Sequence, residues 1–98
     1  MNISKVQEGT SLRITLEGRL DTTTAPQLEN VFKESLSNIT SLVLDFSALS
    51  YISSAGLRVI LSAIKIMKKQ GSMVVQNVNQ TVMEVFDITG FSDMLDIR

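Results

Sequence analysis

The chain has 98 residues, of which 44% are hydrophobic and 19% are charged, so we expect one domain over residues 1–98 with a single core. It contains no cysteine and no histidine, which excludes disulfides, thiolate chemistry and a Ser-His-Asp triad, and removes the commonest ligands of zinc and iron sites. With 9 basic and 10 acidic residues, no signal-peptide pattern and no apolar run of membrane-spanning length, the sequence predicts a cytoplasmic protein whose partners are neither nucleic acid nor membrane.

The first third of the chain predicts two strands and a helix. A short strand is expected over 3–6 and a second over 11–17, where apolar and polar residues alternate strictly, as in a strand with one solvent-exposed face. We expect these two strands to be antiparallel. A helix is predicted to follow, because Thr24 and Gln27 have the spacing of a capping box. Its apolar stripe comprises Leu28, Val31, Phe32 and Leu36.

The middle third predicts a buried strand and a long helix. Residues 42–46 are almost continuously apolar, which is typical of a strand buried on both faces. Asp45 is expected at the end of this strand, where the segment leading to Ser53-Ser54-Ala55-Gly56 departs. A helix is predicted from Ser54 to Lys69, with Gly71 as its stop. Its apolar residues at helical spacing include Leu57, Ile60, Leu61, Ile64 and Met67.

The last third predicts a short strand over 73–75, a helix that is capped by Asn79 and ends near Gly90, and an edge strand over 94–97. Strand-helix-strand units favour parallel pairing with right-handed crossovers in the middle of the sheet. The expected fold class is therefore α/β, a mixed four- to five-stranded sheet with helices packed against it.

The serine pair Ser53-Ser54 lies at the predicted junction between a strand and a helix. At such a helix start, unpaired backbone N–H groups and the helix dipole favour a negative group such as phosphate. A serine there is most often a helix cap, which is worth about 1 kcal/mol. From the residues alone, a cap and a phosphorylation site are both open.

Three segments together resemble a known family. LVLDFSALSYISSAGLRVIL at 42–61, preceded by EGRLDTTTAPQLE at 17–29 and followed by EVFDITGF at 84–91, resembles the STAS domain of bacterial anti-sigma factor antagonists. The resemblance extends from Leu12 to Ile97 and therefore implies a single STAS domain.

The resemblance implies a regulatory protein rather than an enzyme, with no cofactor and no metal. In that family the unphosphorylated domain binds a serine kinase that is also an anti-sigma factor, and this binding frees the sigma factor. The kinase, which supplies the ATP, then phosphorylates a serine at the start of the second helix and ends the interaction. A PP2C-type phosphatase reverses the modification. The free protein is expected to be a monomer.

By the same resemblance, Ser54 is the phosphoacceptor, because it stands two positions before Gly56-Leu57. Ser53 is the second choice, and it replaces an aspartate that many members carry. With Ser54 as the phosphoacceptor, we assign Ser53 the role of helix cap. Gly56 is expected to allow a close approach of two backbones and to let the active site of the kinase reach Ser54. The predicted partner-binding surface comprises Asp21, Thr22, Thr23, Ser53, Ser54, Ala55, Gly56 and Arg58.

Other functions are compatible with these features. One is the same phosphorylation switch with an output other than a sigma factor. Another is a passive STAS-like subunit of a transport complex, in which the serine only caps its helix. A nucleotide hydrolase is disfavoured, because GxxxxGK[ST] is absent and no usual base accompanies a serine nucleophile. Paired acid-base catalysis by Asp21 and Asp45 is also disfavoured, because each aspartate fits a loop.

Overall fold

The computed structural model describes residues 1–98. In chain order it contains β1 (Asn2–Glu8), β2 (Ser11–Leu20), α1 (Ala25–Ser35), β3 (Ser41–Ile52), α2 (Ser54–Gln70), β4 (Ser72–Gln76), α3 (Gln80–Thr89), the 3-10 turn η1 (Phe91–Asp93) and β5 (Asp96–Ile97). The strands form one sheet in the order β1-β2-β3-β4-β5. β1 is antiparallel to β2 and the remaining pairs are parallel, which confirms the predicted mixed sheet and α/β fold class.

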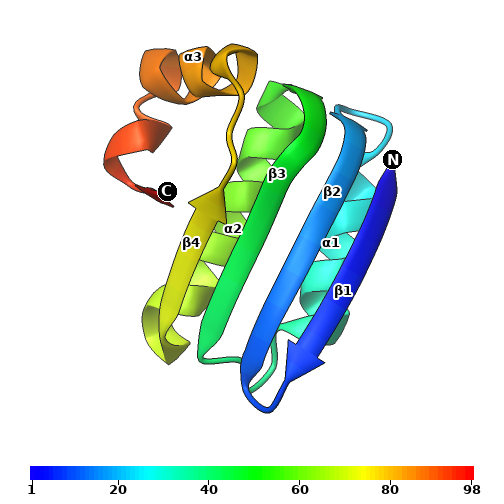
Figure 1. Cartoon of the computed structure of the whole chain (residues 1–98), viewed down its shortest axis with the longest axis vertical. Helices are drawn as coiled ribbons and strands as arrows, with labels where there is room; N and C mark the ends of the chain where they lie inside the picture. Colours follow the sequence, from blue (N-terminus) through cyan, green and yellow to red (C-terminus); the bar gives the residue numbers. More distant parts are fainter.

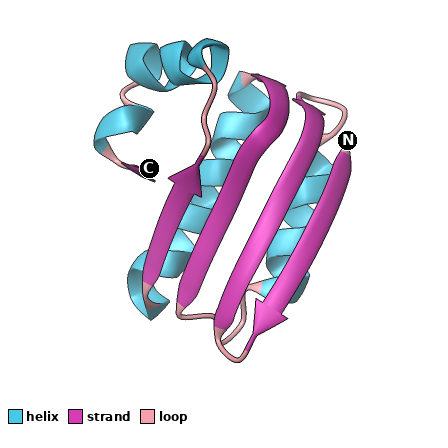
Figure 2. Ribbon diagram, in the orientation of Figure 1, coloured by secondary structure: helices cyan, strands magenta, loops and turns pink.

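The core lies between the sheet and one pair of helices. Figure 1 and Figure 2 show α1 and α2 along the same face of the sheet, with α3 at one end. On β2, Leu12, Ile14 and Leu16 are buried against these helices, as their alternation predicted. α3 is held to the middle of β3 by aromatic packing, since the ring centroids of Phe46 and Phe86 are 6.2 Å apart. The other face of the long strands carries no helix.

β3 is longer than the sequence predicted. The apolar run of 42–46 stops at Phe46, where we expected the strand to end, but the strand continues to Ile52. Two shifts in its register with β2 each insert an extra residue on β3. These bulges return Leu49 and Ile52 to the buried face, so the strand stays in the core. The longer strand places the serine pair well beyond Asp45.

The starts of two helices are stabilised in different ways. Asn79 caps α3 as predicted, because its side-chain oxygen accepts a backbone N–H three residues on at 2.8 Å. The predicted capping box of Thr24 and Gln27 is wrong. The Thr24 hydroxyl instead donates to the Arg19 carbonyl at 2.8 Å and accepts the Asp21 N–H at 2.9 Å. It therefore closes the loop before α1 and makes no side-chain cap bond to the helix.

Gly71 ends α2 as predicted. A side chain at this position would collide with the carbonyl oxygen of Thr40, so the turn into β4 requires glycine. The final edge strand is present but shorter than predicted, because η1 and Met94 precede it and only residues 96–97 pair with β4. None of the helices combines the length and the hydrophobicity that crossing a bilayer requires.

Candidate functional site

The ends of β2 and β3 bring two loops together. Leu20 is paired with Ile52 in the parallel register, and the Ser53 N–H donates to the Leu20 carbonyl at 2.9 Å. The loop 21–24 after β2 and the turn 53–56 after β3 therefore emerge side by side at one end of the sheet. In Figure 1 this is the end where β3 enters α2. The threonines and serines of the predicted partner-binding surface therefore share one rim of the molecule.

The two serines have different roles in the fold. Ser53 is the N-cap of α2, with extended backbone angles (φ −102°, ψ 175°), and its hydroxyl accepts the Gly56 N–H at 3.5 Å. Ser54 is the first residue of the helix and is exposed, and its hydroxyl makes no hydrogen bond within the protein. The cap role that we assigned to Ser53 is confirmed, and the Ser54 hydroxyl is available to a partner.

Asp21 organises the neighbouring loop. Its Oδ1 accepts the Thr23 hydroxyl at 2.7 Å and the backbone N–H groups of Thr23 and Thr24 at 3.0 and 3.2 Å. These hydrogen bonds, that of the Thr23 hydroxyl above all, lower the pKa of Asp21 against the opposing effect of desolvation. Thr22 and Thr23 are exposed on the rim. Asp21 is thus an ionised loop anchor, and the loop geometry we expected for it is confirmed.

Arg58 and Ala55 line a depression on the helix side of the serine turn. The depression has a volume of about 220 Å³ and lies between the starts of α1 and α2, with Thr22 at its edge. Arg58 is exposed, and its guanidinium makes no hydrogen bond or salt bridge within the protein. The remaining lining residues are Ala25, Pro26, Glu29 and Val59. Three predicted partner-binding residues, one from the loop after β2 and two from the start of α2, therefore share one hollow.

Gly56 is a packing residue. It is buried, and a Cβ at this position would lie 2.7 Å from Cγ of Leu20 and 3.0 Å from Cγ1 of Ile52. Gly56 is closely approached, as we expected, but the expectation that a second backbone makes the contact is wrong, because the neighbours are side chains. The first turn of α2 can rest on the ends of β2 and β3 only because this residue has no side chain. Its contact with a partner stays a prediction.

Asp45 does not lie at the end of β3, contrary to our expectation, and so does not stand beside the serine turn. It lies in the middle of β3, on the face without helices, where Oδ2 accepts Arg13 Nη2 at 2.6 Å. Oδ1 accepts the Ser47 N–H at 2.9 Å and the Asn77 amide at 3.2 Å. Burial by itself would raise the pKa of Asp45, but these hydrogen bonds outweigh it and lower the pKa to about 2. Asp45 is therefore a structural anion, and the sequence carried no signal that Arg13 or Asn77 would be its partners.

The chain is similar in sequence to a known family and in fold to several solved structures. The STAS domain family matches residues 2–98 of the chain. The anti-sigma-B factor antagonist of Bacillus subtilis is 30% identical over 98 residues, covering 99% of this chain and 90% of the relative. An anti-sigma factor antagonist from Mycobacterium paratuberculosis has the same fold, with a TM-score of 0.88 and 20% identity over 98% of this chain and 83% of that one.

SpoIIAA of Bacillus in its phosphorylated form also has this fold. Its TM-score is 0.77 and its identity 19%, over 99% of this chain and 91% of that one. The unphosphorylated form of SpoIIAA has the same TM-score of 0.77. At such identities the solved structures show the fold alone, whereas the match to the family and the B. subtilis relative extend over the sequence as well.

Proposed function

The chain belongs to the STAS domain family, among the anti-sigma factor antagonists, and on this premise we propose that it is a partner switch controlled by phosphorylation of Ser54. The unphosphorylated form binds an anti-sigma factor that is also a serine kinase, and the sigma factor is released. The kinase transfers phosphate from its own ATP to Ser54 and the complex separates. A PP2C-type phosphatase restores the first form. The protein itself is a regulatory partner that catalyses no reaction, and it is a monomer when free.

The observation that carries this proposal is the different state of the two serine hydroxyls. Ser53 is occupied as the cap of α2, whereas the Ser54 hydroxyl is exposed and unbonded at the first helical position. A kinase needs a hydroxyl that it can reach without opening the fold, and Ser54 meets this requirement. The existence of phosphorylated and unphosphorylated structures of SpoIIAA, which shares this fold, supports the proposal.

The position of Ser54 also suggests how phosphate ends the interaction. A phosphate adds about −1.5 to −2 charges at neutral pH. At a helix N-terminus these charges face unpaired backbone N–H groups and the positive end of the helix dipole, which tolerate them. The modification is therefore expected to leave the domain folded and to act at the interface, by bulk and repulsion against the partner surface. A clear loss of thermal stability in the phosphorylated protein would contradict this mechanism.

Phosphosite mapping tests the proposal directly. The purified protein is incubated with ATP and lysate of its native cells, then digested and sequenced by mass spectrometry, beside Ser54→Ala and Ser53→Ala variants. We expect phosphate on Ser54 in the wild type and in Ser53→Ala, and none on either serine in Ser54→Ala. Each variant removes one hydroxyl, so each is the matched control for the other.

Other results have distinct meanings. Phosphate on Ser53 in the wild type would keep the switch and move it by one residue. No phosphate on either serine, in a lysate whose kinase is known to be active, would favour the passive subunit of a transport complex. In that alternative a Ser54→Asp variant binds its partner as the wild type does, whereas our proposal predicts that this variant loses binding.

A further inference from the structure

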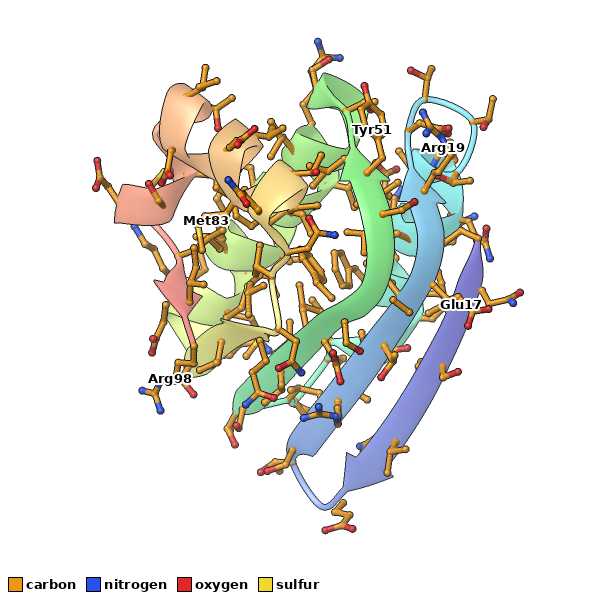
Figure 3. The ribbon with its side chains drawn as sticks, turned by 45° about the horizontal axis from the view of Figure 1, so that its top comes forward. Glu17, Arg19, Tyr51, Met83 and Arg98 are labelled. Atoms are coloured by element: carbon orange, nitrogen blue, oxygen red, sulfur yellow. The ribbon has the colours of Figure 1, made fainter.

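An arginine and a tyrosine lie together on the surface beside the serine turn. The guanidinium carbon of Arg19 is 4.3 Å from the centroid of the Tyr51 ring, which is within the range of a cation–π contact. Figure 3 shows both side chains at the end of β2 and β3. Arg19 directly precedes Leu20, whose carbonyl holds Ser53, and only Ile52 separates Tyr51 from that serine. The pair is therefore continuous with the candidate site.

A bulge in β3 creates the pairing. Gly18 is opposite Leu49, but Arg19 is opposite Tyr51, so Ser50 is an extra residue on β3. The Ser50 hydroxyl donates to the Gly18 carbonyl at 2.9 Å and closes the bulge. Without this extra residue, Ser50 would stand opposite Arg19 and the ring would not. Bulges beside functional sites commonly redirect a side chain in this way, and here the ring is placed on the sheet face opposite α2.

Most donor groups of Arg19 are unused within the protein. The side chain is 61% exposed, and its nearest carboxylate contact, from Nε to Oδ2 of Asp21, is 3.7 Å and so longer than a hydrogen bond. The Tyr51 ring and the Asp21 carboxylate restrict the side chain, while its terminal nitrogens have no hydrogen-bond partner within the protein. A guanidinium that is held in place and has two parallel N–H donors free can bind a carboxylate through two hydrogen bonds. Arginine and tyrosine are also the residues enriched at the centres of protein interfaces.

We propose that Arg19, supported by the ring of Tyr51, binds a carboxylate on the surface of the kinase that phosphorylates Ser54. This inference rests on the proposed function and adds two residues to the predicted contact surface. The serine turn then has one arginine on each side, Arg19 on the sheet side and the unpaired Arg58 on the helix side. The complementary partner surface is acidic at both positions.

An acidic partner surface explains why phosphorylation of Ser54 weakens binding rather than strengthening it. A phosphate on Ser54 places about −1.5 to −2 charges between the two arginines. These charges repel the carboxylates of the partner and compete with them for the guanidinium groups. The acidic surface that attracts the kinase to the unphosphorylated protein therefore opposes binding once Ser54 carries phosphate.

The initial rate of phosphate incorporation into Ser54, measured in native-cell lysate with added ATP at low protein concentration, tests this inference. We expect Arg19→Glu to lower the rate at least about tenfold and Tyr51→Leu to lower it about two- to fivefold. Arg98→Glu is the matched control, since it makes the same charge change at the β5 edge of the sheet, where Arg98 is paired with Asp96 (Figure 3). Its rate should stay within about twofold of the wild type.

Two further measurements separate recognition from folding. Arg19→Lys keeps the charge but loses the paired donors of the planar guanidinium. Its rate of phosphate incorporation should therefore lie between those of the wild type and Arg19→Glu. Added salt should slow the wild type more than Arg19→Ala, because salt screens the attraction that the variant lacks. Thermal unfolding of each variant reports whether the fold is intact, and if Arg19→Glu does not fold, Arg19→Lys decides the question.

The possible failures are distinguishable. A folded Arg19→Glu variant phosphorylated at the wild-type rate, or an Arg19→Lys rate equal to the wild type when Arg19→Glu does not fold, overturns the inference and leaves the proposed function in place. A wild type without phosphate on Ser54 overturns the proposed function, and the inference is lost with it. If Arg19→Glu and Arg98→Glu lowered the phosphorylation rate equally, the effect would come from net charge, and this result would also refute a local contact.

Discussion

Replacement of Gly56 by alanine should destabilise this protein, although alanine is the better helix former. The new Cβ would lie 2.7 Å from Cγ of Leu20 and 3.0 Å from Cγ1 of Ile52, and both of these side chains are buried. Cγ of leucine is a branch point close to the backbone, so Leu20 cannot swing away without leaving the core. The first turn of α2, which carries Ser54, must therefore move.

The expected magnitude follows from two opposing effects. Overpacking a filled core costs about 1–3 kcal/mol. Exchanging glycine for alanine within a helix gains up to about 1 kcal/mol, and less in the first turn. The net loss should be about 1–2 kcal/mol in the free energy of unfolding, which lowers Tm by about 4–15 °C in a domain of this size. Urea denaturation and a thermal scan followed by circular dichroism measure both quantities.

A second variant isolates the contact. Leu20→Ala removes the atom nearest to the new methyl group, so the double variant Gly56→Ala, Leu20→Ala should be more stable than the sum of the single changes predicts, by about 1 kcal/mol. A Gly56→Ala protein at least as stable as the wild type would refute the reasoning, because helix propensity would then outweigh the contact. Additive losses in the double variant would show that the strain lies elsewhere.

Other predictions concern the ion pair and the caps. Because the pKa of Asp45 is lowered from 3.8 to about 2, its contribution is complete above pH 4 and is lost as the pH falls through 2. The free energy of unfolding from urea titrations should therefore drop by about 2 kcal/mol over that interval, and Asp45→Asn should flatten the drop. Ser53→Ala should cost about 0.5–1 kcal/mol and Ser54→Ala almost nothing in the same assay, since only Ser53 caps α2; equal losses would contradict the assignment. Asn79→Ala should cost about 1–2 kcal/mol, because its side chain also donates to the Leu49 carbonyl at 2.7 Å, and a Tm within one degree of the wild type would refute it.

Much of the fold follows from local patterns. Alternation over 11–17 predicted the exposed and buried faces of β2, and helical spacing after Ser54 predicted α2. Both patterns indicate which side chains must be buried. They can be recognised within a short stretch of sequence, because strands and helices each have a characteristic spacing of buried residues. The cap at Asn79 and the stop at Gly71 were also readable, since each depends on the chemistry of one side chain.

The predictions failed where a residue's role depends on another part of the chain. The apolar spacing beyond Phe46 matches neither a strand nor a helix, because the two bulges of β3 form only against β2. Asp45 was therefore predicted at the end of its strand, whereas it lies in the middle. Thr24 has the sequence of a cap but bonds within its own loop, because Asp21 and the Arg19 carbonyl lie within reach.

By itself the sequence determined the class of fold, its resemblance to STAS domains and the position of the serines at a helix start. These depend on composition, periodicity and local motifs. Only the tertiary structure decided that the Ser54 hydroxyl is left without a hydrogen bond, and that Arg19 and Tyr51 meet beside it. The physical reason is that strand register is a property of two chain segments, and a single extra residue in one of them changes every pairing beyond it.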